Sequence, residues 1–205
     1  MQMLLGEAAI IPSLLHRIDQ ECKSSSEPNI SVMEDIATSL IDVLCRLQRL
    51  EDSLENDGHR PYGQIPSPDF DLPSTDFALW FPSITTANVL AHLWTFKIVC
   101  LTELRDLATF FPPVLDQPLS NGIHPSQLGG QIIELSILTC RSMEFTLQDK
   151  MALYGPASTF YPLQIAYKSL KNSSAQHKNA AYCESVVERL VAKGLRAVPH
   201  IVFGT

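Results

Sequence analysis

Apolar side chains recur at helical spacing along the first quarter of the chain. Residues 3–22 and 31–54 each place an apolar residue at every third or fourth position, which is the period of an amphipathic helix. Pro12 either kinks the first of these helices or begins a second short one. Asn29 and Ser31 are both suited to cap the next helix. The apolar stripe of that helix consists of Val32, Ile36, Leu40, Val43, Leu44, Leu47, Leu50 and Leu54.

The later part of the chain shows the same period and no strand-like alternation. Gly194 is suited to the left-handed position that follows a helix, and the tail 195–205 is expected to pack as an extended segment. The sequence therefore predicts the all-α class, as an irregular bundle of about five to seven helices. The predicted helices of this part cover residues 83–110, 127–154, 156–170 and 176–193.

Two long proline-rich connectors interrupt the helices. The first lies in residues 56–75 and is either a cover over a site or the remnant of a shortened region, because structureless connectors of this length are uncommon in compact domains. The second begins at Pro112-Pro113 and includes QPLSNGIHPS. We expect a single domain over 1–205, with N-terminal helices in 1–55, the first connector in 56–82, a helical core in 83–194 and a tail in 195–205.

Composition narrows the class of protein. Lys and Arg number 15 against 22 Asp and Glu, which gives a net charge of −7 and argues against direct binding to nucleic acid. The five cysteines form no CxxC pair, so we expect reduced, buried thiols in an intracellular protein, cytoplasmic or nuclear. No signal peptide is recognised at the start. Polar residues break the apolar run 84–101, which favours a buried helix over a membrane span.

Several polar residues lie within the apolar helices. His92 and Glu103 are on the margin of the apolar face of the 83–110 helix, about 16 Å apart along its axis, so each needs a partner from another helix. Glu134, Arg141, Glu144 and Gln148 share one stripe of the 127–154 helix.

Two interpretations of that stripe remain open. The first is a structural Arg–Glu–Gln network that fixes helix packing. The second is a pocket whose polar groups orient a mainly apolar ligand. The catalytic candidates are His92, Arg141, Tyr161 and Tyr167. The ligand-binding candidates are Trp80, His92, Phe96, Glu103, Arg141, Glu144, Gln148 and Gln164.

The common catalytic and cofactor motifs are not found in the sequence. It contains no GxSxG, GxxxxGK[ST], GxGxxG or HExxH pattern. His177 and Glu184 are seven residues apart on one predicted helical face, but no third ligand is indicated, so the metal signal is weak. We therefore predict neither a cofactor nor a metal site.

Three blocks in order resemble the C-terminal half of the fungal-specific transcription factor regulatory domain. They are LWFPSITTANVLAHLWTFKIVCLTEL (79–104), CRSMEFTLQDKMALYGPASTFYPLQIAY (140–167) and GLRAVPHIV (194–202). In that family this all-α region follows a binuclear zinc cluster. The six-cysteine cluster and its basic linker are absent from the present sequence. The resemblance implies a helical module for effector sensing or protein contacts that does not bind DNA itself, and a fragment of a larger regulator would fit equally well.

Two functions from different classes follow as expectations. The first is a regulatory module in secondary metabolism that senses an apolar small molecule, such as a terpenoid or polyketide, or contacts a regulatory protein. The alternative is a cofactor-independent enzyme of a natural-product pathway, a cyclase, isomerase or Diels-Alder-type pericyclase. Such an enzyme would act mainly by restricting the substrate's conformation, aided by a hydrogen bond to a carbonyl.

Overall fold

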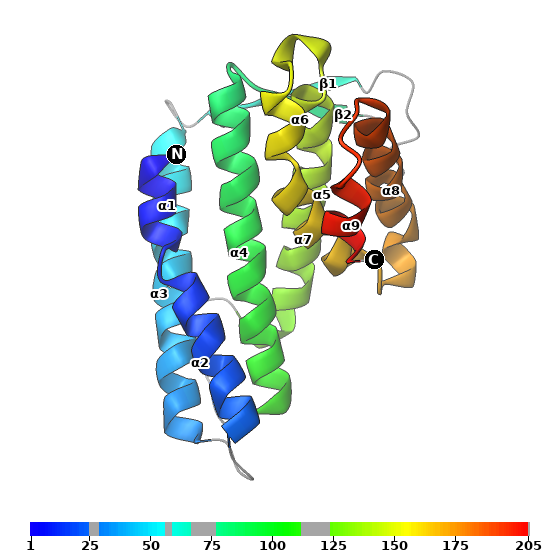
Figure 1. The fold of residues 1–205 in the computed structure, drawn as a ribbon. Coiled ribbons are helices and arrows are strands. Elements are labelled where there is room, and N and C mark those ends of the chain that lie inside the picture. The colour runs from blue at the N-terminus through cyan, green and yellow to red at the C-terminus, as the bar shows by residue number, and fades with distance from the viewer. Residues whose placement is uncertain (25–28, 56–58, 67–76, 112–123, 205) are drawn as a thin grey trace.

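The computed structural model describes residues 1–24, 29–55, 59–66, 77–111 and 124–204, and the all-α class is confirmed there. The longer helices run up and down the molecule roughly side by side, with a small sheet at one end (Figure 1). The elements are α1 (Gln2–Ala8), α2 (Ile11–Ser24), α3 (Ile30–Leu54), β1 (Gly63–Pro66), β2 (Phe77–Trp80), α4 (Ile84–Phe110), α5 (Leu128–Thr146), α6 (Tyr154–Ser158), α7 (Phe160–Leu170), α8 (His177–Ala192) and α9 (Val198–Phe203).

The N-terminal helices α1 and α2 pack along α3. The helix is interrupted at residues 9–10. Pro12 therefore lies in the first turn of α2, where a second helix begins, and does not kink the first. Proline is tolerated there because the first N–H groups of a helix have no partner within it. Asn29 caps α3 by accepting a hydrogen bond from the Ser31 N–H at 3.0 Å. Asn29 is thus the cap, and Ser31 belongs to the first turn.

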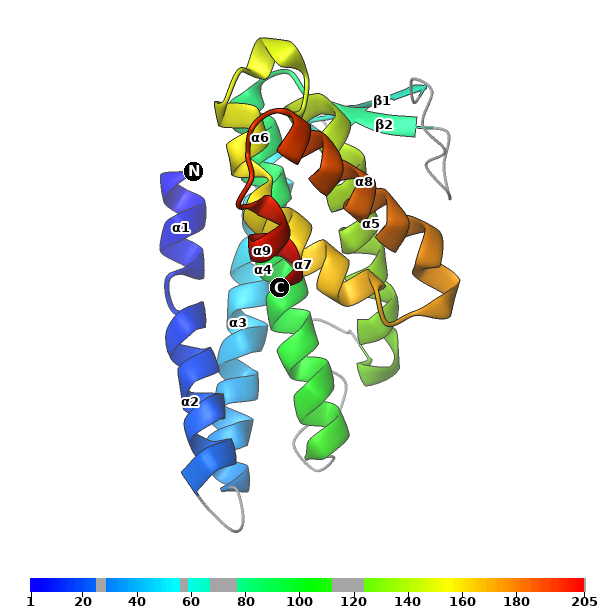
Figure 2. The same ribbon diagram turned by 45° about the vertical axis from the view of Figure 1, so that its right-hand side comes forward.

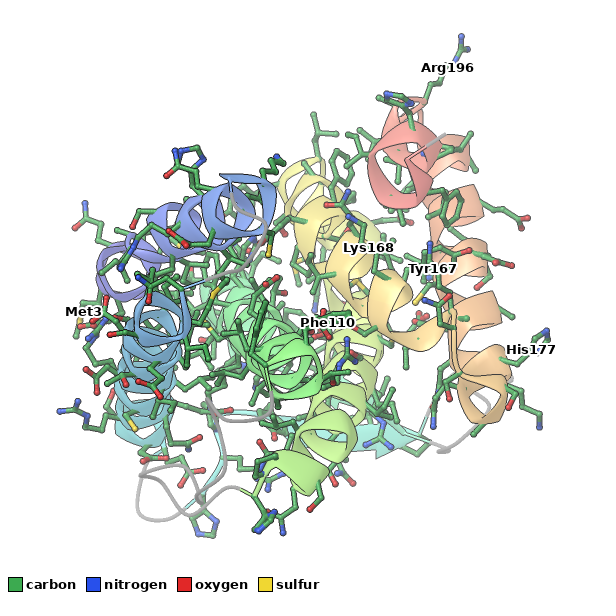
Figure 3. All side chains as sticks on the ribbon, turned by 90° about the horizontal axis from the view of Figure 1, so that it is seen from below. Met3, Phe110, Tyr167, Lys168, His177 and Arg196 are labelled. Carbon is green, nitrogen blue, oxygen red and sulfur yellow. The ribbon has the colours of Figure 1, made fainter. Side chains whose placement is uncertain are left out.

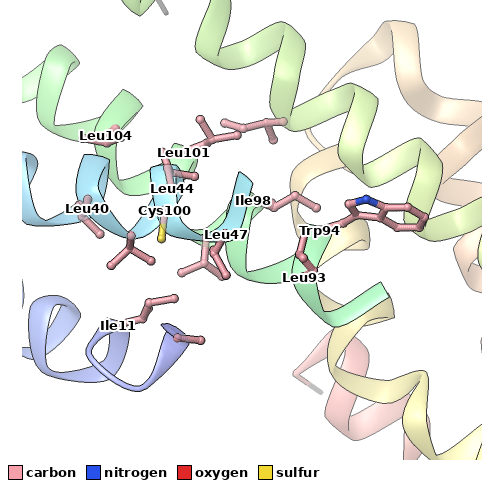
Figure 4. Packing of buried hydrophobic residues seen from close by; sticks show 14 of the residues in the cluster. Ile11, Leu40, Leu44, Leu47, Leu93, Trp94, Ile98, Cys100, Leu101 and Leu104 are labelled. Atoms are coloured by element: carbon pink, nitrogen blue, oxygen red, sulfur yellow. The ribbon is translucent and has the colours of Figure 1, made fainter. Parts of the chain in front are cut away.

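Helix α4 is the central element and lies between α3 and α5 (Figure 2). Ser83 caps it by accepting from the Thr86 N–H at 3.1 Å. By length and composition α4 could cross a membrane, but 72% of its most apolar window is buried inside the protein. Its buried side chains, including the fully covered Trp94, interleave with those of α3 (Figure 4). This burial favours a core helix.

Strands β1 and β2 were not predicted from the sequence. They pair antiparallel, with Gly63 opposite Trp80 and Pro66 opposite Phe77. The sequence shows no alternating pattern at these two segments, because strands of four residues are too short to show the period of two. Residues 67–76 of the first connector and 112–123 of the second lie outside the described residues.

The corner after α5 differs from its predicted course. Helix α5 ends at Thr146 instead of continuing to residue 154. Gln148 takes an extended backbone conformation with ψ 142°, and a short 3-10 turn leads into α6. Gly155 lies directly against the end of α5, where an added Cβ would be 2.2 Å from the Thr146 carbonyl oxygen. The close approach of the backbone at Gly155 sets the corner.

The tail is a short helix and not an extended segment as the sequence suggested. In α9, Pro199 lies in the first turn, which favours helix initiation, and Gly204 ends the helix in the left-handed conformation. Val198 and Val202 of α9 are buried. Gly194 has φ +93°, so the predicted left-handed position after the preceding helix is confirmed.

Helix α5 belongs to two apolar clusters. Its residues Ile132 and Phe145 join the cluster formed with α1 to α4 and β2. Cys140 and Met143, on its other side, join the cluster formed with α7, α8 and α9. Helix α5 therefore connects the cluster of the N-terminal helices with the cluster of the C-terminal helices.

Candidate functional site

A cavity of about 580 Å³ opens between α3, α4 and α5. We call it the α3–α4–α5 groove. Its volume lies within the range of small-molecule sites. Its lining residues are Leu44, Cys45, Gln48, Arg49 and Glu51 of α3, Lys97 and Leu101 of α4, and Gln131, Glu134 and Leu135 of α5. The spacing of three or four residues on each helix means that one face of each contributes.

A buried lysine is the central polar group of the groove. The Lys97 side chain is only 7% exposed. Its Nζ donates to Gln48 Oε1 at 2.7 Å and to Glu51 Oε2. Glu51 also accepts from the Trp94 indole N–H, at 2.8 Å. A buried ammonium is costly unless it is paired and hydrogen-bonded, so this cluster of Gln48, Glu51, Trp94 and Lys97 is held in one geometry.

The lining combines apolar walls with balanced charge. Leu44, Leu101 and Leu135 supply apolar surface from the three helices. Lys97 and Arg49 are the cations of the lining, and Glu51 and Glu134 are its anions. Six of the ten lining residues are polar or charged, so the groove offers hydrogen-bonding groups between apolar surfaces, a combination that can orient a small organic molecule.

The structure places His92 outside this groove, as a half-buried residue of α4. Its Nδ1 lies 2.9 Å from the Asn88 carbonyl oxygen, one turn earlier on the same helix. Burial lowers the pKa of His92 below its usual value, and the backbone hydrogen bond opposes this shift. His92 therefore has the contacts of a satisfied core histidine.

The predicted polar stripe of α5 finds its partners on α8. Glu144 accepts hydrogen bonds from Nη1 and Nη2 of Arg189, at 2.6 and 3.1 Å, and from the Tyr182 hydroxyl at 2.7 Å. Arg141 is not its partner. The expected network exists in part: Glu144 joins α5 to α8, whereas Glu134 of the same predicted stripe is exposed and lines the α3–α4–α5 groove. Gln148 lines a small cavity of about 170 Å³ together with Glu144 and Arg189.

Arg141 lies apart from that network. Its buried Nε has no hydrogen-bond partner among the described residues. Desolvation lowers the pKa of Arg141, while the nearby Cys140 and Tyr62 oppose the shift. Arg141 does not line the α3–α4–α5 groove.

Three predicted aromatic residues make ring contacts. Phe96 and Tyr161 join α4 to α7, with ring centroids 6.1 Å apart. Trp80 packs edge-on against Phe145 at 5.1 Å, and the Lys150 ammonium lies 4.4 Å from the Trp80 ring centroid. Trp80 thus holds β2 on α5. All three aromatic side chains thus pack between elements of the fold.

Tyr167 and Gln164 hold the C-terminal helices on α7. The Tyr167 ring packs against Phe203 at 4.8 Å, and its hydroxyl donates to Glu184 Oε1 at 3.2 Å. Gln164 Nε2 donates to the Ile201 carbonyl oxygen at 2.6 Å. The sequence suggested a site here, and the contacts show how α7, α8 and α9 are joined.

The weak metal signal on α8 has no third ligand within the described part of the chain. Tyr167 of α7 and His177 of α8 come from neighbouring helices (Figure 3), and with Glu184 they line a cavity of about 210 Å³. Over the described ranges, no three His, Cys, Asp or Glu side chains form a group that could hold a metal ion.

Glu103 is the other predicted polar residue of α4, and its environment gives a pH-dependent prediction. Burial raises its pKa, with Asp106 and Asp19 adding to the effect and Arg105 opposing it. The folded state therefore binds this proton more tightly than the unfolded state. The stabilisation that results is complete below the unfolded pKa of Glu and is lost as pH rises through the folded pKa.

We expect Glu103→Gln to gain stability relative to the wild type as pH rises from about 4 to about 7, because the amide never carries the buried charge. Urea unfolding of both proteins at the two pH values measures this difference. The Asp52→Asn variant, at an exposed position of α3, serves as the control. An equal effect of Glu103→Gln at both pH values would contradict the prediction.

Sequence reasoning missed the groove cluster. Lys97 is the single charged residue between Ile84 and Leu101, the most apolar run of the chain, and that isolation was the available signal. The periodicity of one helix could not show that Gln48 and Glu51 of α3 would meet it. Comparison with protein-family models, curated proteins and solved structures finds no match to this chain. The resemblance to the fungal regulatory domain thus rests on the residue patterns alone.

Proposed function

We propose that this chain is a regulatory module that senses a small molecule and that the effector binds in the α3–α4–α5 groove. The observation that carries the proposal is the cavity of about 580 Å³ with Lys97 buried in an apolar wall. The resemblance to the helical regulatory region of fungal transcription factors supports the same class. An apolar natural product, a terpenoid or polyketide of secondary metabolism, suits the apolar walls, and the module would act in the cytoplasm or nucleus.

Binding in the groove would act through α5. A ligand that contacts α3, α4 and α5 together favours the arrangement in which these helices are held at one distance. Such a ligand shifts the equilibrium between two arrangements of these helices only as far as its affinities for the two arrangements differ. Because α5 also packs against α7 and α8, its position links the groove to the surface of the C-terminal helices. A regulatory protein would bind that surface.

Binding has more support than catalysis. None of the four catalytic candidates, His92, Arg141, Tyr161 and Tyr167, is among the lining residues of the groove. The polar groups of its central cluster are held in mutual hydrogen bonds. A cyclase or isomerase needs groups placed on the reacting atoms, and the four candidates lie outside the groove that supports the binding proposal.

Cys45 provides a direct test, because it lines the groove while Cys22 lies exposed on α2. We expect an effector present at ten times its Kd to slow alkylation of Cys45 by iodoacetamide about tenfold and to leave Cys22 unchanged. A panel of neutral terpenoids and polyketides is screened in this way, with both rates read by mass spectrometry.

The matched control is Leu135→Trp, which fills the groove from α5. This variant should lose the protection of Cys45 for every compound that protects the wild type. Protection that survives in Leu135→Trp, or equal slowing at Cys22, would contradict an effector site in the groove.

A further inference from the structure

Lys97 retains a hydrogen-bond donor for a ligand. A lysine ammonium has three N–H donors and no acceptor. Two of them are used by Gln48 and Glu51. Lys97 lines the groove, so its third donor can reach an oxygen placed inside the cavity. No acceptor for it is found in the described ranges of the chain.

The charges around Lys97 select the type of oxygen. Glu51 already balances the ammonium at salt-bridge distance. A carboxylate or phosphate placed on the third donor would lie close to the Glu51 carboxylate, and like charges at such short separations repel each other. Arg49 and Glu134 offset each other within the lining. The groove therefore favours a neutral acceptor over an anion.

We propose that the effector is a neutral, mainly apolar molecule with a carbonyl oxygen that accepts a hydrogen bond from Lys97 Nζ. The class comprises ketones, esters, lactones and amides on an apolar skeleton. The carbonyl suits the position because it offers two lone pairs and no competing donor to a group that can only donate. A charged donor makes such a hydrogen bond stronger than a neutral donor would. This inference rests on the proposed function, since it names the chemistry of the same groove.

The test uses three probes with one skeleton: benzophenone, diphenylmethane and 4-benzoylbenzoate. They differ in the carbonyl and in the carboxylate alone. Their Kd values are measured from the protection of Cys45 against iodoacetamide. We expect benzophenone to bind about tenfold more tightly than diphenylmethane, as one charge-assisted hydrogen bond predicts. The anionic 4-benzoylbenzoate should bind more weakly than benzophenone.

The variant Glu51→Gln/Lys97→Met removes the donor and its counter-charge together, so no isolated charge remains in the wall. Its helical content is checked by circular dichroism. In the folded double variant we expect the preference for benzophenone over diphenylmethane to fall within about twofold, with the affinity for diphenylmethane retained. A structural role of Lys97 alone would lower both affinities together. The comparison of the three probes on the wild-type protein still tests the proposal if the variant does not fold.

Irradiated benzophenone also maps its own site, because its excited carbonyl forms covalent bonds to neighbouring C–H groups. We expect cross-links to the groove residues Leu101 and Leu135. Cross-links confined to other surfaces would overturn the proposed function. Cross-links in the groove with equal affinities for benzophenone and diphenylmethane would overturn only the carbonyl inference. Tighter binding of 4-benzoylbenzoate would overturn the argument for a neutral ligand.

Discussion

Replacing Gly155 by alanine is expected to destabilise the protein by about 3 kcal/mol or more, because the corner has no room for a methyl group. A Cβ at this position would lie 2.2 Å from the Thr146 carbonyl oxygen and 2.6 Å from Met151 Cβ. Thr146 is the last residue of α5, so its oxygen belongs to the helix end and cannot rotate away. The chain would have to separate α6 from α5 to admit the side chain.

Gly130→Ala is the matched control for this prediction. Gly130 lies in the first turn of α5, and an added Cβ there would have nothing within 4 Å. Alanine should stabilise this position by up to about 1 kcal/mol, since it restricts the unfolded chain and favours the helix. Urea unfolding followed by circular dichroism measures both variants. A similar small change for Gly130→Ala and Gly155→Ala would contradict the role of the corner.

The sequence predicts much of this fold because helix period and capping are local properties. The Asn29 cap and the left-handed Gly194 follow from a few neighbouring residues, and both are found. The end of α5 was misplaced because the apolar pattern continues through the corner. The folded chain instead brings Gly155 against the end of α5, a contact that the local pattern does not reveal.

The candidate site was less predictable, because its residues come from three helices. The stripe on α5 was recognised as needing partners, but the partner of Glu144 is Arg189, which lies 45 positions later in the chain. Similarly, Lys97 meets residues 46 and 49 positions earlier. Spacing within one helix shows which side chains share a face. It does not show which other helix covers that face.

The Lys97–Glu51 pair should be the most strongly coupled ion pair that can be tested in the groove. Glu51→Gln leaves the buried ammonium without a counter-charge and is expected to cost about 3 kcal/mol. Lys97→Met should cost less, about 1–2 kcal/mol, because Glu51 is 22% exposed and keeps the Trp94 N–H as a donor. The double variant leaves no isolated charge. It should therefore cost less than the sum of the two single changes, by about 1.5 kcal/mol or more.

The exposed pair Arg17–Asp35 supplies the control cycle. Its side chains approach to 2.7 Å but are 43% and 64% exposed, so solvent screens their interaction. Its coupling should stay below about 1 kcal/mol. Equal coupling in the two cycles would mean that Lys97 is solvated and that the groove is not a dry site, which would remove the basis for a selective hydrogen bond to a ligand. A larger coupling for Lys97–Glu51 requires a low-dielectric wall, and that is the environment in which a single lysine donor can select a neutral carbonyl compound.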